Sequence, residues 1–193
     1  MVESERSLIS HGEAHYFNMS NTPTPDFRSD RPNDDDIQSM LNVREFGAIG
    51  DGVSLDTDAI NRSIEAAANA GGGTVYFPSG KYLSFSIRLR SHVRLHLDEG
   101  ATIVAAKPGQ HVGAYDEAEP NEWGDVHGYQ DFGHSHWHNS LIWGDGLEDI
   151  SITGTGRIEG RALTRTSSKR AGLANKAIVL KQCRNVLLRD FSV

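Results

Sequence analysis

Apolar and polar residues alternate along most of the chain after residue 41, in short runs separated by glycine-containing turns. The longest such stretch is TVYFPSGKYLSFSIRLRSHVRLHLDEGATIVAA (74–106), in which β-branched and aromatic residues alternate with polar ones around a PSG turn. A period of two is typical of β-strands that bury one face. The pattern therefore predicts a series of short strands.

One segment has the period of a helix instead. In TDAINRSIEAAANA (57–70) the apolar residues recur at helical spacing and share one face. These residues are Ile60, Ile64, Ala67 and Ala68. Asp56 or Thr57 is expected to cap the start of this helix and Gly71 its end. The glycines at 71–73 do not form a phosphate loop, because that motif requires the order strand, glycines, helix, and here the helix comes first.

A repeat appears when the chain is shifted by 36 residues. IWGDGLEDISIT (142–153) then matches IVLKQCRNVLLR (178–189) in pattern. The matched apolar pairs are Ile142 with Ile178, Leu147 with Cys183, Ile150 with Val186, and Ile152 with Leu188; Trp143 falls on Val179. A weaker third copy places His92, Val93 and Leu95 on Asp149, Ile150 and Ile152. Repeated strand and corner units predict a solenoid of stacked coils, in which each coil buries the apolar face of its neighbour.

The repeat also interprets an acidic, glycine-rich stretch, GDGLEDISITGTGRIEG (144–160). Four nearby carboxylates could perform acid/base chemistry, but Asp and Gly also serve sharp turns. Because the solenoid places bends here, we interpret the acids as structural or solvated corner residues. They are Asp145, Glu148, Asp149 and Glu159.

Two segments lie outside the repeat. Residues 1–41 are polar and aperiodic, and NTPTPDFRSDRPNDDDIQS (21–39) contains three of the six prolines, so we expect a poorly ordered leader or linker there. The domain is expected to span 42–193. Residues 107–140, rich in His, Asp, Glu and Trp, are expected to form one long excursion between strands, and such excursions are often functional.

Composition excludes several classes of function. A net charge of −7 disfavours nucleic acid as a partner. The apolar runs are far shorter than the roughly 20 residues that a membrane span needs, and no secretory signal is visible. The one cysteine, Cys183, excludes an internal disulfide, and we expect it to be a small buried side chain.

The order of several motifs resembles the start of pectin-degrading parallel β-helix enzymes. The motifs are VREFGAIGDGVSLDTDAI (43–60), GGGTVYFPSGKYL (71–83), RLHLDEGATIVAA (94–106), YQDFGHSHWHNS (129–140) and NSLIWGDGLEDISITGTGRIEG (139–160). The closest resemblance is to glycoside hydrolase family 28, the polygalacturonases and rhamnogalacturonan hydrolases. It implies an all-β fold: a right-handed parallel β-helix with an N-terminal capping helix, truncated at its C-terminus because the chain stops inside a strand.

The resemblance also implies a function. Such enzymes hydrolyse galacturonate-containing pectic polysaccharide with inversion, use no cofactor, and act outside the cytoplasm as monomers when full length. Their catalytic motifs are Asn-x-Asp, Asp-Asp, Gly-His-Gly and Arg-x-Lys, which follow the coil at which this chain ends. Gly133 and His134 resemble part of the histidine motif, but Ser135 replaces its second glycine. No catalytic residue is therefore assigned, and the chain alone is expected to be inactive.

The excursion supplies the candidate substrate-binding residues, which are His134, His136, Trp137 and Trp123. An indole ring offers a flat apolar surface for a sugar. His134, His136 and His138 alternate and could share a face suited to a metal, but a polar loop is the preferred interpretation and no metal ligand is assigned. A local excess of positive charge could attract a polyanion, although a solvated basic loop is the default. It comprises Arg161, Arg165, Lys169, Arg170 and Lys176.

Two rival functions remain open at this stage. One is a non-catalytic β-helix fragment that binds saccharide or has a structural role. The other is a lyase of the same superfamily, which would use Ca²⁺ and an arginine base in place of paired acids.

Overall fold

The structure, a computed structural model, describes residues 40–119, 138–163 and 175–193. The predicted leader lies outside this part of the chain except for its last two residues. Within the described residues, no helix combines the length and the apolar character needed to cross a bilayer.

The strands form three sheets in which every pairing is parallel. Sheet A has the order β1 (Leu41–Asn42), β3 (Gly73–Phe77), β6 (Val93–Leu97), β9 (Glu148–Thr153), β12 (Arg184–Leu188). Sheet B has the order β10 (Arg157–Glu159), β7 (Ala101–Ala105), β4 (Gly80–Ser84), β2 (Asp51–Leu55). Sheet C has the order β11 (Ile178–Lys181), β8 (Ile142–Asp145), β5 (Ile87–Arg88).

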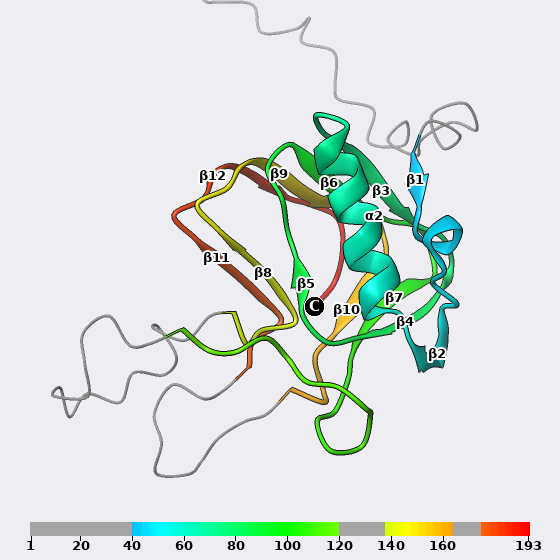
Figure 1. Ribbon diagram of the computed structural model, residues 1–193. Helices are drawn as coiled ribbons and strands as arrows, with labels where there is room; N and C mark the ends of the chain where they lie inside the picture. Colours follow the sequence, from blue (N-terminus) through cyan, green and yellow to red (C-terminus); the bar gives the residue numbers. More distant parts are fainter. Residues whose placement is uncertain (1–39, 120–137, 164–174) are drawn as a thin grey trace, which may run out of the picture. The chain divides into compact units, whose positions relative to one another are not determined.

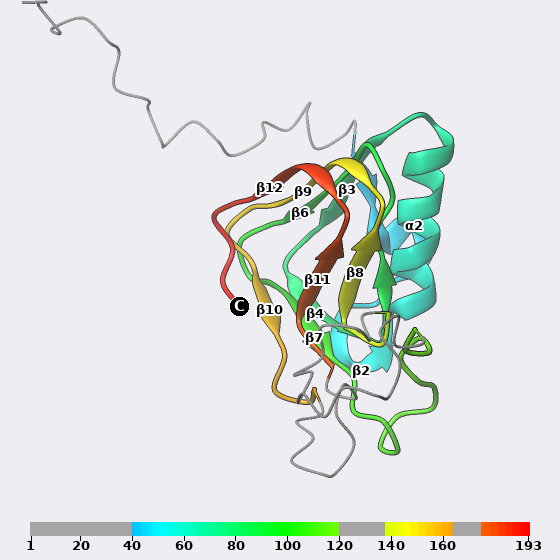
Figure 2. The same cartoon turned by 90° about the vertical axis from the view of Figure 1, so that its left-hand side faces the viewer.

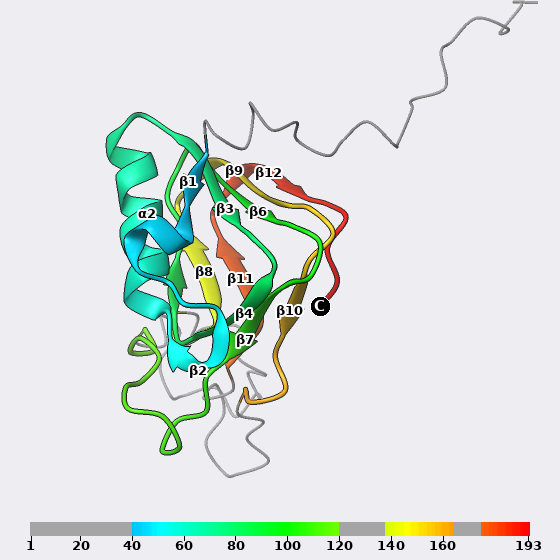
Figure 3. The same cartoon turned by 90° about the vertical axis from the view of Figure 1, so that its right-hand side faces the viewer.

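The chain visits the three sheets in rotation, so each turn of the path forms one coil (Figure 1). One coil is β3, β4 and β5, the next is β6, β7 and β8, and the third is β9, β10 and β11. The helix α2 (Thr57–Asn69) follows β1, the 3-10 helix η1 (Val43–Phe46) and β2, so it takes the place that a sheet C strand has in later coils. Figures 2 and 3 show α2 at one end of the stack and β11 and β12 at the other. The predicted parallel β-helix with an N-terminal helical cap is confirmed.

The predicted repeat is confirmed by the strand register. Ile178 pairs with Ile142, Val186 with Ile150 and Leu188 with Ile152. The weaker third copy is also correct, since Leu95 pairs with Ile152. In sheet A, Val75, Leu95 and Ile152 form one inward row and are almost wholly buried. Such rows fill the interior because successive coils place equivalent side chains about 4.8 Å apart.

A bend at the start of β6, β9 and β12 in sheet A also repeats. His92, Asp149 and Asn185 all adopt the left-handed backbone region, with φ of 63°, 55° and 55°. Asn185 Nδ2 donates to Asp149 Oδ1 at 2.7 Å, and His92 Nδ1 lies 3.1 Å from Asp149 Oδ2. Polar side chains of neighbouring coils thus stack at this bend, as the corner interpretation of Asp149 predicted.

Helix α2 packs its predicted face inward, with Ile60, Ile64 and Ala67 buried against the first coils and Ala68 partly buried. Its N-cap residue is Asp56, but the carboxylate makes no side-chain hydrogen bond to the helix. Instead, Asp56 accepts from the backbone N–H groups of Ile49 and Gly50, at 2.6 and 3.1 Å. The predicted N-cap position at Asp56 is thus confirmed, but the carboxylate binds the loop before β2 and not the first turn of the helix.

The last coil is open on its outer side within the described residues. β12 is exposed along its whole length, and Val186, Leu187 and Leu188 are 40%, 44% and 46% exposed. Cys183 is only partly buried, with Sγ near Lys181 O at 3.2 Å. The predicted burial of Cys183 is thus incomplete, because no further coil in the described part of the chain covers it.

Candidate functional site

The outer face of sheet C carries polar and aromatic side chains. In β8, Ile142 and Gly144 are buried while Trp143 and Asp145 alternate with them and are partly exposed. On β5, Arg88 is the register neighbour of Trp143. The sheet therefore presents a guanidinium, an indole and a carboxylate side by side on its outer surface.

The start of the excursion folds against this face. Asp116 accepts two hydrogen bonds from Arg88: Nε donates to Oδ2 at 2.8 Å, and Nη2 donates to Oδ1 at 2.6 Å. It also accepts from Trp143 Nε1 at 2.9 Å, while its backbone N–H donates to Ser86 Oγ at 2.9 Å. A bidentate Arg–carboxylate pair fixes orientation as well as distance. Asp116 thus holds the excursion onto two neighbouring coils.

The charge of Asp116 is stabilised by these partners. Burial acts to raise the pKa of the carboxyl group, but the hydrogen bonds from Arg88 and Trp143 outweigh it, so the pKa lies below the ordinary 3.8. The hydrogen bonds to Asp116 raise the pKa of Arg88. Both groups therefore remain charged at neutral pH, and the pair persists there.

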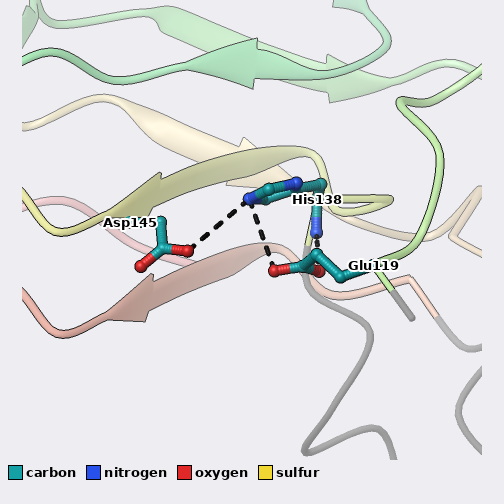
Figure 4. Close-up of side chains that lie close together, drawn as sticks. All are labelled: Glu119, His138 and Asp145. Carbon is teal, nitrogen blue, oxygen red and sulfur yellow. Dashed lines mark hydrogen bonds and ion pairs between the residues drawn. The ribbon is translucent and has the colours of Figure 1, made fainter. Parts of the chain in front are cut away.

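The end of the excursion meets the same face through His138 (Figure 4). The imidazole lies on the Trp143 ring, with centroids 3.9 Å apart and planes tilted by 31°. Its Nε2 is 3.3 Å from Glu119 Oε1 and 3.8 Å from Asp145 Oδ2. The His138 backbone N–H donates to the other Glu119 oxygen, Oε2, at 3.0 Å. Glu119, His138 and Asp145, here called the His138 cluster, offer three ligand atoms that all lie within 4.8 Å of one another.

A groove of about 540 Å³ adjoins this network, between α2, β5 and residues 112–116. Three arginines line it, Arg62, Arg88 and Arg90, together with Asp58 and Glu65. Arg90 pairs with Glu65 at 3.0 Å, and Arg62 donates to Phe46 O at 2.8 Å. A groove with mixed charges and partly exposed guanidinium groups suits a polar ligand that carries a carboxylate.

The predicted substrate-binding residues His134, His136, Trp137 and Trp123 lie outside the described residues, so they stay predictions. The segment that contains them leaves the described structure at Glu119 and re-enters it at His138, and both residues belong to the His138 cluster. Of the basic group, Arg165, Lys169 and Arg170 also lie outside, while Arg161 pairs with Glu159 at 3.0 Å.

The corner acids have different surroundings. Glu148 pairs with Arg184 at 2.6 Å, as the structural interpretation expects. Asp145 ends β8 directly before the bend at Gly146, where φ is 66°, so it lies beside a bend as predicted, and it also belongs to the His138 cluster. Trp143 pairs with Val179 as predicted for a coil residue, but it also contacts the site through Asp116 and His138.

Sequence reasoning missed Arg88, Asp116 and Glu119. The alternation of β5 could have placed Arg88 on the outer face, because its neighbours Ile87 and Leu89 are apolar and prove to be buried. Asp116 and Glu119 lie in an aperiodic stretch, where no sequence signal indicates which strand they meet.

The chain matches the family model described as "Rhamnogalacturonase A/epimerase, pectate lyase-like" over residues 40–121. Plasmin and fibronectin-binding protein A of Streptococcus pneumoniae is 50% identical over 68 residues, which are 34% of this chain and 10% of that protein. Mannuronan C5-epimerase AlgE5 of Azotobacter vinelandii is 48% identical over 71 residues, which are 37% of this chain and 7% of the epimerase. The chain thus spans a tenth or less of the length of these relatives.

Solved structures give a similar picture over more of the chain. A family 28 exopolygalacturonase of Yersinia enterocolitica has a TM-score of 0.58 and 24% identity, covering 79% of this chain and 34% of that one. A hyperthermoactive exopolygalacturonase of Thermotoga maritima has a TM-score of 0.58 and 20% identity, covering 79% and 40%. PfbA, a surface adhesin of S. pneumoniae, has a TM-score of 0.52 and 27% identity, covering 79% and 32%. The chain therefore shares the parallel β-helix fold of these proteins, and residues 40–121 match a pectate lyase-like family model.

Proposed function

We propose that this chain forms the first coils of a glycoside hydrolase of the polygalacturonase type, which cleaves galacturonate-containing pectic polysaccharide with inversion. The observation that carries the proposal is the match of residues 40–121 to a family model that names a rhamnogalacturonase, a pectin-degrading class. The coil stack, which two exopolygalacturonases share over 79% of the chain, is consistent with it at the level of the fold.

The saccharide is proposed to lie along the outer face of sheet C and the adjoining groove. Galacturonate polymers are polyanions, and Arg88 and Arg90 expose 49% and 40% of their side chains there. Because a guanidinium group has five N–H donors, Arg88 and Arg90 can each contact a substrate carboxylate with the donors that do not face Asp116 or Glu65. The partly exposed Trp143 ring and the predicted Trp123 and Trp137 would provide apolar surface for sugar rings.

Inverting hydrolysis needs two carboxyl groups roughly 6.5–9.5 Å apart, one to protonate the leaving oxygen and one to activate water. The sequence motifs that supply these groups in family 28 cannot be placed in residues 1–193. The 193-residue protein is therefore proposed to bind oligogalacturonate without cleaving it.

Binding and cleavage are measured separately. Titration of purified protein with oligogalacturonate by calorimetry is expected to show binding that Arg88→Gln weakens. Arg94→Gln is the matched control, because Arg94 lies on sheet A and donates to Ser151 Oγ at 3.1 Å, away from the groove. An assay for new reducing ends is expected to show none. Equal affinity in the two variants would refute the proposed binding face, and reducing-sugar release would refute the absence of catalytic groups.

A second candidate function is non-catalytic binding at a surface. It is favoured by the 50% identity to the plasmin and fibronectin-binding protein and by the fold likeness to PfbA. Surface-immobilised fibronectin and plasmin would test it directly: saturable binding of the 193-residue protein together with no affinity for oligogalacturonate would favour this candidate.

The epimerase and lyase chemistries of other relatives give distinct products. Similarity to mannuronan C5-epimerases and to alginate lyase 7 supports including alginate as a substrate. Proton NMR detects C5 inversion, and ultraviolet absorbance detects the unsaturated uronate that a lyase releases. Either signal would replace the hydrolase proposal.

A further inference from the structure

We propose that the His138 cluster is a binding site for a borderline transition-metal ion, best represented by Zn²⁺, with His138 Nε2, Glu119 and Asp145 as ligands. The inference does not depend on the polysaccharide proposed above. It rests on how the three side chains converge.

Both carboxylates approach the same ring nitrogen. Glu119 Oε1 and Asp145 Oδ2 lie 3.3 and 3.8 Å from His138 Nε2, and this atom is buried and makes no hydrogen bond with any described residue. One N–H can point along only one good hydrogen bond. Two acidic oxygens around a buried nitrogen are instead the arrangement that a shared cation satisfies.

A second histidine in the chain shows the alternative arrangement. His92 also has two acidic neighbours, but Glu148 lies nearest its Nε2, at 3.9 Å, and Asp149 nearest its Nδ1, at 3.1 Å. The carboxylates therefore face opposite nitrogens and cannot share one ion with the ring. His92 is also half exposed. The His92 group is thus a solvated corner, and it provides a matched control for the His138 cluster.

The separations fit a metal of the size of zinc. Zn–N and Zn–O distances near 2.0–2.1 Å place two tetrahedral ligand atoms about 3.3 Å apart. The distance from His138 Nε2 to Glu119 Oε1 is 3.3 Å, and the 3.8 Å distance to Asp145 needs to shorten by about 0.5 Å. Asp145 can make this movement, because its side chain is about one third exposed.

The ligand types decide which metal is expected. An imidazole nitrogen with two carboxylates suits Zn²⁺ and similar ions, whereas Ca²⁺ prefers six to eight oxygen ligands. Three protein ligands leave at least one position for water or substrate.

The surroundings hold the ligands in place before any ion arrives. The Trp143 ring supports the imidazole, and the His138 N–H binds the second oxygen of Glu119 at 3.0 Å. Asp145 is held by the pairing of β8 with β11. Partners that orient metal ligands in this way raise affinity, because less motion is lost on binding.

The test uses the untagged 193-residue protein, stripped of metal and titrated with ZnCl₂ by calorimetry, with indole NMR signals recorded in parallel. We expect one Zn²⁺ per chain and a shift of the Trp143 Nε1–H signal, which Trp143→Phe would assign. Asp145→Asn and Glu119→Gln are expected to weaken zinc binding at least ~10-fold each. Asp149→Asn and Glu148→Gln are the matched controls and are expected to leave it unchanged.

Three results would overturn the proposal: no stoichiometric zinc binding, zinc binding that neither Asp145→Asn nor Glu119→Gln weakens, or equally tight binding of CaCl₂ at the same residues. Circular dichroism checks that each variant is folded. If Glu119→Gln unfolds, Asp145→Asn still decides the outcome, because Asp145 is partly exposed at a strand end and the substitution keeps its shape.

Discussion

Stacking of inward rows is expected to provide most of the stability of this β-helix, and one row of sheet A tests this. Val75, Leu95, Ile152 and Leu188 are successive register partners on β3, β6, β9 and β12. Leu95 is wholly buried between two covered coils, whereas Leu188 on the last strand is 46% exposed. The same substitution, Leu→Ala, can thus be made at two positions of one row that differ mainly in how deeply the side chain is buried.

The structure gives the expected magnitudes. Leu95→Ala removes buried atoms and leaves a cavity that the rigid coils on either side cannot close, so it should cost about 3 kcal/mol, within the usual ~2–5 kcal/mol. Full burial of a leucine side chain contributes roughly 1.5–3 kcal/mol to stability. Leu188 is only about half buried and its removal leaves no enclosed cavity, so Leu188→Ala should lower the free energy of unfolding by about 1 kcal/mol.

Urea unfolding monitored by circular dichroism measures both variants. With a slope of about 2 kcal/mol/M, Leu95→Ala should lower the midpoint by roughly 1.5 M and Leu188→Ala by about 0.5 M or less. If the two variants shifted the urea midpoint equally, with unchanged slopes, that result would refute the argument that stacking between coils provides most of the stability.

Three further predictions concern corners, charges and the open coil. Gly154→Ala should destabilise the folded protein by well over the ~1–2 kcal/mol of left-handed backbone strain, because φ is 99° and a Cβ would also clash with the β6 backbone. Gly146→Ala should cost the strain alone, because φ is 66° and a Cβ there would meet open space. Thermal unfolding measures both variants. Carboxyl NMR should find the pKa of Asp56 above 3.8, because of burial, and that of Asp116 below it. As pH falls below 3.8, the stabilisation that ionised Asp116 gives to the folded state should therefore be lost. Protonation of Asp56 should instead stabilise the folded state, because its pKa is higher there than in the unfolded chain. If Asp116 titrated at a higher pH than Asp56, this reasoning would be contradicted. Because β12 pairs on one side only within the described residues, we expect its exposed edge to make the 193-residue protein self-associate. Leu187→Lys on this strand should reduce that self-association in light scattering, and an unchanged mass distribution would contradict the expectation.

The fold could be predicted well because its signals are local and repeated. Alternation along the sequence identified the strands, and the 36-residue shift identified the partners of Ile142 and Ile150, which the register of sheets C and A confirms. A solenoid brings each residue next to its equivalent in the next coil, so the period of the sequence predicts which residues are in contact.

The candidate site could be predicted only in part. The excursion was recognised as a place for function, but Glu119 and Asp116 carry no periodic signal, and the proximity of Asp145 to His138 depends on where the excursion returns to sheet C. Asp145 and Glu148, three residues apart, illustrate the difference. One faces His138 and the other Arg184, because Asp145 ends a strand of sheet C and Glu148 begins one of sheet A.

The sequence by itself determined the coil, its period, its helical cap and its glycine corners, because each depends on residues that are near in the chain or repeat at a regular interval. Only the tertiary structure decided which acids converge on one imidazole and which meet an arginine. Which groups meet depends on how the irregular segment that contains Asp116 lies against sheet C. Contacts with residues distant in sequence, such as the hydrogen bond from Arg88 to Asp116, fix this position.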